Sequence, residues 1–112
     1  MTNPTTPLGE FAEQVRSKNA GPFWITLDIF LRTEDDYEWL RNAGAITAAT
    51  ISALYLVPAE DIQIFEMATL CAIKISFPRP VTAGSLEDRD QHAGQQYLPL
   101  AQLEIPVQPV HS

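Results

Sequence analysis

The sequence predicts one α+β domain, and three observations indicate it. The chain has 112 residues, which is enough for one domain with a modest core and too few for two. Hydrophobic residues make up 46% of the chain and charged residues 19%, a balance that is typical of a folded protein. Segments with a helical hydrophobic period and segments with a strand period follow one another along the chain, which favours mixed α+β structure.

The N-terminal part is predicted to contain a tail, a short helix, a loop and a long strand. Residues 1–7 hold two prolines and three threonines, so we expect an extended or disordered tail. Residues 8–15 show the i, i+3, i+4, i+7 spacing of an amphipathic helix, with a strand over residues 8–12 as the alternative. After a loop at residues 16–22, the period changes to two over residues 23–31. This period predicts a central strand, with a mixed second face formed by Trp24, Thr26, Asp28 and Phe30.

Two capped helices are expected in the middle of the chain. Thr33 precedes three acidic residues that suit the first turn of a helix, and Gly44 is placed to end that helix. Thr47 can cap a second helix, which we expect Pro58 to end. The inward stripe of this second helix is predicted to be Ala48, Ile51, Leu54 and Tyr55.

Further strands are expected in the second half of the chain. Residues 62–66 and 70–77 have the length and alternation of strands, and residues 78–80 (Pro-Arg-Pro) interrupt the pairing. Residues 82–97 form a long polar loop, and residues 100–107 alternate as a last strand.

About four strands with two or three helices in this order fit a ferredoxin-like sandwich. We expect the domain to span residues 8–106 and a C-terminal tail to cover residues 107–112.

Composition excludes several classes of function. The net charge is −7 with seven Lys and Arg residues, which argues against nucleic acid as a partner because phosphate binding needs a basic surface. No apolar run reaches the roughly 20 residues of a membrane span, and the first residues lack a signal pattern. Cys71 is the single cysteine, is expected in the core and cannot form an internal disulfide. We therefore expect a cytoplasmic protein without a membrane partner.

The loop after the first predicted helix is the leading candidate for a binding site. Arg16 and Lys18 supply positive charge and Ser17 a hydroxyl, while backbone amides near Asn19 and Gly21 could form a concave anion site. The alternative is a helix C-terminus, in which the two cations balance the helix dipole and Asn19 or Gly21 is the cap. The spacing leaves both interpretations open.

A second group of candidates lies further along the chain. Lys74 and Arg79 are a basic pair that would join the first loop if the fold brings them together, and a solvated lysine is the alternative. Gln95 and Gln96 can offer amide donors and acceptors to a polar ligand, or form a turn before the last strand. The predicted ligand-binding residues are Arg16, Ser17, Lys18, Asn19, Gly21, Arg79, Gln95 and Gln96.

The sequence contains no complete catalytic or metal constellation. Asp28, Lys74 and His92 are candidates for proton transfer, but the sequence supplies none of them with an orienting partner. Asp88, Asp90 and His92 have the spacing of a metal set. A catalytic zinc site needs three converging ligands, usually with more than one histidine, so we expect neither a metal nor another cofactor.

Several short segments, taken in order, carry a resemblance to one family. They are residues 16–23, 26–29, 72–74, 77–80, 94–96 and 103–106. On these segments the chain is similar, from about residue 8 to residue 106, to the domain-of-unknown-function family numbered 4387. Residues 84–90 depart from the Gly-Asp-x-Asp character expected there, which argues against a role for Asp88 or Asp90.

The resemblance implies a partner protein. Members of the family are similar to the C-terminal ferredoxin-like domain of AtuA-like (acyclic terpene utilisation) proteins, and they typically occur beside or fused to a larger AtuA-like protein. This implies a small accessory subunit, inactive alone, of a two-component enzyme of organic-acid or acyl-CoA catabolism, such as a lyase or hydratase.

Under that hypothesis the predicted residues take distinct roles. Arg16 and Lys18 hold a substrate carboxylate or phosphate or anchor the interface, Asn19 and Gln95 orient polar groups, and Asp28 or Lys74 moves a proton. The alternative is a stand-alone, homo-oligomeric domain that binds a small acid or has a regulatory role. An independent enzyme is a third hypothesis.

Overall fold

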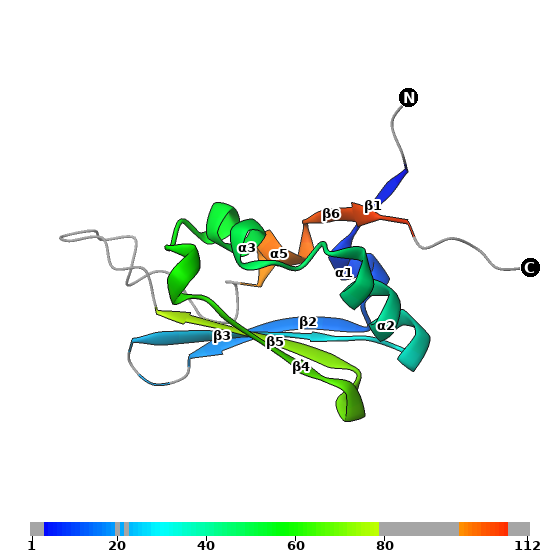
Figure 1. Cartoon of the computed structure of the whole chain (residues 1–112), viewed down its shortest axis with the longest axis horizontal. Helices are drawn as coiled ribbons and strands as arrows, with labels where there is room; N and C mark the ends of the chain where they lie inside the picture. The colour runs from blue at the N-terminus through cyan, green and yellow to red at the C-terminus, as the bar shows by residue number, and fades with distance from the viewer. Residues whose placement is uncertain (1–3, 20, 22, 79–96, 108–112) are drawn as a thin grey trace, which may run out of the picture.

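A four-stranded antiparallel sheet forms one layer of the molecule, and helices form the other (Figure 1). The computed structural model describes residues 4–19, 21, 23–78 and 97–107, which form a single α+β domain. The strand order is β2-β3-β5-β4, and a separate pair of strands, β1 and β6, lies among the helices. The strands are β1 Thr5–Pro7, β2 Gln14–Asn19, β3 Trp24–Phe30, β4 Gln63–Met67, β5 Ala72–Pro78 and β6 Glu104–Pro106.

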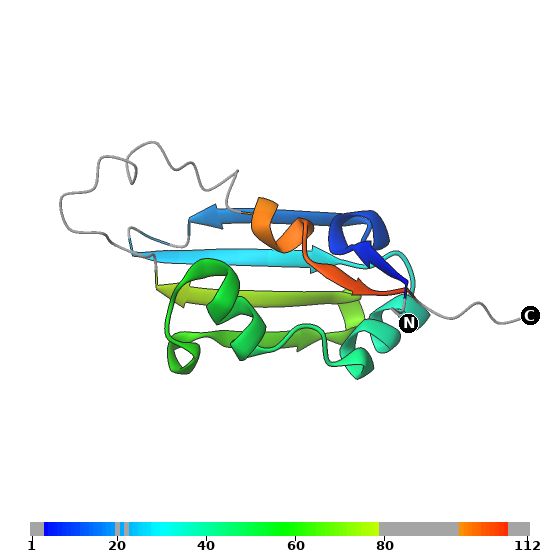
Figure 2. The ribbon, with the colours of Figure 1, turned by 90° about the horizontal axis from the view of Figure 1, so that it is seen from above.

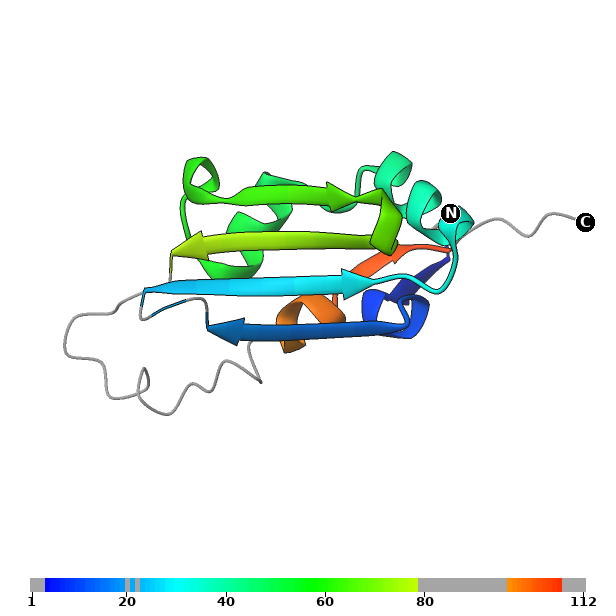
Figure 3. The same ribbon diagram turned by 90° about the horizontal axis from the view of Figure 1, so that it is seen from below.

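All the described helices lie on one side of this sheet (Figure 2). They are α1 Leu8–Phe11, α2 Glu34–Ala43, α3 Ala48–Tyr55 and α5 Leu98–Ala101, with 3₁₀ turns η1 at Ala59–Asp61 and η2 at Ala68–Leu70. Seen from the other side, the sheet lies in front of every described helix (Figure 3). No helix in the described ranges is long and apolar enough to cross a membrane.

The core lies between the sheet and the helices. Alternate residues of the two central strands, β3 and β5, face the helices and are buried, as the period of two predicted. From these strands the core receives Ile25, Leu27, Ile29, Ile73, Ile75 and Phe77, and from the other elements it receives Leu8, Tyr37, Leu40, Ile51, Leu100 and Ile105. The predicted central strand is therefore confirmed as β3.

The three predicted helix caps, Thr33, Gly44 and Thr47, are confirmed. The Thr33 hydroxyl accepts a hydrogen bond from the Asp36 amide at 3.0 Å, and α2 ends at Gly44 with φ 72°. The Thr47 hydroxyl accepts from the Thr50 amide at 3.1 Å. The second helix ends earlier than predicted, because Leu56 adopts a left-handed conformation with φ 59° two residues before Pro58.

The prediction for the N-terminal segment was wrong in two respects. The first helix is a single turn that ends at Phe11, where the Ala12 amide bonds to the Leu8 carbonyl. Residues 14–19 are strand β2, not the end of a helix and a loop. Residues 5–7, expected in an extended or disordered tail, are extended and form β1, which pairs with β6.

The C-terminal prediction was wrong in its first half. Residues 98–101 form helix α5 with Pro99 in its first turn, where a missing amide hydrogen costs nothing. The strand is only Glu104–Pro106, and its partner β1 lies at the other end of the chain. Val107 also belongs to this pairing, because its amide bonds to the Pro4 carbonyl. Residues 108–112 of the predicted tail lie outside the described residues.

Smaller differences occur around β5. Cys71 precedes the strand in a left-handed conformation with φ 49°, is partly buried against the core, and its carbonyl accepts from the Leu31 amide. Pro78 is paired with Trp24 and ends the strand. The described elements of the two hairpins and their helices follow the order β2-β3-α2-α3-β4-β5-α5, which differs from the β-α-β-β-α-β order of a ferredoxin-like sandwich.

Candidate functional site

The sheet face turned away from the helices carries a row of charged side chains. Arg16 on β2 lies opposite Asp28 on β3, and Asp28 lies opposite Lys74 on β5. The next strand places Phe65 opposite Lys74. Directly opposite residues on one face of an antiparallel sheet have neighbouring Cβ atoms. The fold thus brings together one carboxylate and two cations from segments far apart in the sequence, and we call Arg16, Asp28 and Lys74 the charged row.

Arg16 is held in place by two contacts. Its Nε donates to the Asp28 carboxylate at 3.5 Å, which is long for a charge-assisted hydrogen bond. Its guanidinium carbon lies 4.9 Å from the centre of the Phe30 ring, within the range of a cation–π interaction. The Arg16 side chain remains 51% exposed, whereas the Asp28 side chain is 5% exposed. Asp28 therefore orients a guanidinium whose far end stays open to solvent.

The remaining cations of this face lack carboxylate partners among the described residues. No described ion pair involves Lys18 or Lys74. Cations elsewhere are engaged: Arg41 pairs with Glu38 at 2.8 Å and lies 3.9 Å from Glu66. The Arg41 pKa is raised, first by the hydrogen bond to Glu38. The charged row and Lys18 thus form a positive area. Among the described carboxylates, only Asp28 offsets its charge.

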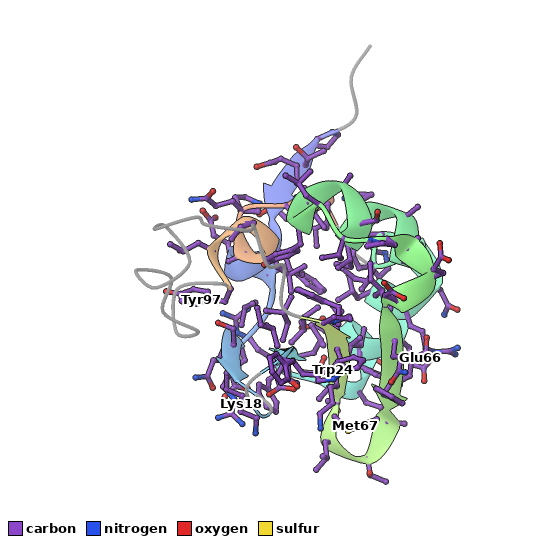
Figure 4. All side chains as sticks on the ribbon, turned by 90° about the vertical axis from the view of Figure 1, so that its left-hand side faces the viewer. Lys18, Trp24, Glu66, Met67 and Tyr97 are labelled. Atoms are coloured by element: carbon purple, nitrogen blue, oxygen red, sulfur yellow. The ribbon has the colours of Figure 1, made fainter. Side chains whose placement is uncertain are left out.

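Aromatic and apolar side chains flank the charged row on the same face. Trp24 is 37% exposed and Phe65 is 46% exposed, while Phe30 and Met67 are half-buried. Figure 4 shows Lys18, Trp24 and Met67 along the sheet side of the molecule. We call this side the open face; it consists of the charged row with Lys18, Trp24, Phe30, Phe65 and Met67.

The structure places the residues of the predicted anion loop in a strand and a turn. Arg16 and Lys18 lie on the open face, but Ser17 lies on the opposite face because strand side chains alternate. Asn19 is the last residue of β2, opposite Ile25. Gly21 lies in the turn between β2 and β3 with φ 88°, a conformation that favours glycine. The two cations therefore lie on a strand face and not in a loop around Gly21.

The other predicted residues divide into two groups. Asp28 and Lys74 lie beside Arg16 on the open face. Arg79, His92, Gln95 and Gln96 lie outside the described residues, as do Asp88 and Asp90. Among the described residues no group of three His, Cys, Asp or Glu side chains could hold a metal ion.

The aromatic part of the open face was not predicted as a site. The period of two placed Trp24 and Phe30 on the same strand face as Asp28, but Phe65 was assigned no role. The signal that could have identified β2 and the direction of Arg16 is weak, because Val15 is the single apolar residue from Gln14 to Asn19. Helical spacing over residues 8–15 obscured that signal.

One cleft lies on the helix side of the molecule, away from the charged row. It has a volume of about 420 Å³ and contains Arg32, which donates hydrogen bonds to the carbonyls of Glu10 and Phe11. Its lining residues are Thr6, Glu10, Phe11, Arg32, Asp36 and Val107. None of the predicted site residues lines this cleft.

The charged row can bind an anion and position a proton donor. The outer nitrogens of Arg16 and the Lys74 ammonium can donate to a carboxylate or phosphate, and Asp28 lies between them as an acceptor. The described residues offer these groups on an open sheet, with no described element above it (Figures 1 and 3). A ligand bound there would stay exposed on its outer side.

Comparison with known proteins identifies the family but no function. No curated protein and no solved structure has a significant match to the chain. The sequence model of a domain of unknown function, DUF4387, matches residues 8–104. The match covers the whole of the sheet and the helices described above. The chain therefore belongs to the DUF4387 family.

Proposed function

We propose that this protein is a small accessory subunit of a two-component enzyme, and that its open face completes a site or an interface with a larger protein. One observation carries the proposal: the charged row is assembled from three strands but lies on a sheet face that no described helix or strand covers. Small-molecule sites bury most of their ligand. A second protein above the open face would supply the missing cover.

The larger protein in this proposal is AtuA-like, and the reaction belongs to organic-acid or acyl-CoA catabolism in the cytoplasm. The sequence resemblance supports this choice of partner, and the charged row agrees with an acidic substrate. Arg16 and Lys74 would hold the substrate carboxylate or phosphate, and Asp28 or Lys74 would move a proton in a lyase or hydratase step.

A ferredoxin-like relationship is part of the same proposal. If the last strand of a β-α-β-β-α-β chain is moved to its start, the strand neighbours become those of β2-β3-β5-β4. This circular relation, with all strands antiparallel and the helices on one face, supports the kinship.

The test is co-expression of the chain with a larger AtuA-like protein from the same organism. We expect the two proteins to purify as a complex, and we expect organic-acid or acyl-CoA turnover only when both are present. Arg16→Gln should lower turnover, while the variant Arg32→Gln on the helix side should not. A chain that forms no complex and leaves the activity of the larger protein unchanged would contradict the proposal. A monodisperse homo-oligomer that binds a small carboxylic acid would instead support the stand-alone domain.

A further inference from the structure

We infer that the open face docks on an acidic protein surface that also presents apolar side chains. This inference deepens the proposed function and shares with it the assumption of a protein partner. It specifies that the open face is the surface buried in the complex, and that the partner offers acidic and apolar groups.

Charge separates the open face from the rest of the molecule. The chain has a net charge of −7, but the open face carries Arg16, Lys18 and Lys74 against the single carboxylate of Asp28. The other acidic residue of this sheet, Glu66, lies on the opposite face and contacts Arg41. A positive face on an acidic chain attracts a negative partner and disfavours wrong partners.

The cations of the open face suit a partner protein that carries carboxylates. Burial of an unpaired lysine beneath another protein would be costly, so a partner that covers Lys18 and Lys74 must supply carboxylates or leave them at a wet rim. Arg16 is already oriented by Asp28 and Phe30. An oriented guanidinium loses less freedom when a partner carboxylate binds it.

Exposed apolar side chains are the second feature of the open face that a partner surface must match. Trp24 and Phe65 are large, rigid and partly exposed, and Trp, Tyr and Arg dominate the energetically important positions of protein interfaces. Phe65 on β4 continues the charged row beyond Lys74, and Trp24 lies to one side of the row, four residues from Asp28 along β3. The partner surface should therefore carry acidic groups flanked by apolar groups.

A second copy of this chain fits the open face poorly. Two open faces in contact would place the cations of one copy against those of the other. The acidic first turn of α2, at Glu34, Asp35 and Asp36, lies on a different part of the chain. Contact between that region and the open face would be heterologous and would give a ring or an open filament of copies, not a twofold dimer.

Nucleic acid also fits less well than protein. Sheet-based readers of single-stranded RNA stack bases on aromatic residues of the sheet. Here Trp24 lies opposite Pro78 and Phe30 opposite Ala72, so neighbouring aromatic side chains do not form a stacking platform on the central strands.

The inference can be tested without knowing the natural partner. ¹⁵N-labelled full chain is titrated with a poly-glutamate peptide and with a glutamate–leucine copolymer of equal length, in low salt. We expect amide shift changes to concentrate on β2, β3 and β5, and we expect the copolymer to bind more tightly than poly-glutamate. Added salt should remove the shift changes and the binding. The double variant Lys18→Glu with Lys74→Glu should weaken the binding of both peptides by about tenfold or more, equivalent to about 1.4 kcal/mol.

Two control variants separate charge from apolar contact. Arg32→Glu with Arg41→Glu changes the net charge equally but should leave the binding unchanged. Trp24→Ser with Phe65→Ser should remove the extra affinity for the copolymer and leave the affinity for poly-glutamate. Circular dichroism verifies that each variant is folded.

Several results would overturn the inference. These are no binding of either peptide, shift changes centred on the helix side, equal losses in the two charge-reversal variants, or tighter binding of a single-stranded oligonucleotide. Self-association that Phe65→Ser abolishes, detected by sedimentation, would assign the face to a second copy. A failure of the AtuA-like protein to bind would refute the proposed function alone if the peptides still mapped to the open face.

Discussion

Tyr55 links three elements of the core through one side chain. Its ring packs against Phe77 of β5 at a centroid distance of 5.1 Å, and its hydroxyl accepts a hydrogen bond from the Leu100 amide of α5 at 3.2 Å. The residue is buried, and burial raises its pKa to about 12. A buried amide that loses its acceptor pays the cost of desolvation, so the hydroxyl stabilises the attachment of α5 to α3.

We expect Tyr55→Phe to lower the free energy of unfolding by about 1–3 kcal/mol at neutral pH, because the Leu100 amide loses its acceptor. The raised pKa adds a pH dependence: the folded state holds the phenol proton more tightly than the unfolded state, whose pKa is near 10. Wild type should therefore lose stability as the pH rises from about 10 to about 12. The variant should lose less over that range. Urea unfolding at a series of pH values measures both effects.

Tyr37→Phe is the control for the neutral-pH effect. Tyr37 is also buried. Burial is the main cause of its raised pKa, and the negative charge of the Glu66 carboxylate is the next. No hydrogen bond to its hydroxyl is found among the described residues. Removal of that hydroxyl should cost less than removal of the Tyr55 hydroxyl, and equal costs would contradict the role assigned to the Leu100 contact.

At the scale of elements, the two central helices end in the same conformation with different residues. Gly44 ends α2 with φ 72°, and Leu56 ends α3 with φ 59°. A left-handed residue with a side chain costs about 1–2 kcal/mol, and glycine avoids this cost. The Leu56 amide still closes the last turn by bonding to the Ser52 carbonyl. The α3 terminus is therefore strained where the α2 terminus is not.

Leu56→Gly should raise the free energy of unfolding by about 0.5–1 kcal/mol. The Leu56 side chain is 86% exposed, so little buried surface is lost with it. Gly44→Ala, the reciprocal change at the end of α2, should destabilise by a similar amount, although nothing lies within 4 Å of the added methyl group. Urea unfolding of both variants measures the pair, and a destabilised Leu56→Gly variant would show that the conformation carries no strain.

The elements that local sequence determines were predictable, and those that depend on distant pairing were not. Thr33, Gly44 and Thr47 act on backbone groups within their own turns, so their roles could be recognised from sequence. The helical spacing over residues 8–15 combined a one-turn helix with the first residues of β2. Strand β6 is three residues long, and its partner β1 is almost a chain length away.

The same distinction applies to the site. Alternation in β3 and β5 fixed the face of Asp28 and Lys74, and this much was predictable. The position of Arg16 depends on the pairing of β2 with β3, which requires β2 to be recognised as a strand. Residue types identified the candidates; only the strand register brought three of them together.

At the scale of the whole molecule, the two ends of the chain close the helical layer. Strands β1 and β6 pair over the helices, and the Leu8 amide bonds to the Leu103 carbonyl beside them. Ile105 of β6 is fully buried in the main core, whereas Val107, just beyond β6, is 42% exposed. The short sheet of β1 and β6 is therefore packed into the core of the domain through Ile105.

Ile105→Ala should therefore lower the free energy of unfolding by about 2–4 kcal/mol, because it removes buried methyl groups and leaves a cavity. Such a loss is a large fraction of the stability of a small domain. Val107→Ala, on the same segment, should cost less than about 1 kcal/mol. Urea unfolding monitored at Trp24 and Trp39 reports on the sheet and on α2 together. If Ile105→Ala leaves the unfolding midpoint unchanged, β6 does not contribute to the core, and the chain ends separate before the domain unfolds.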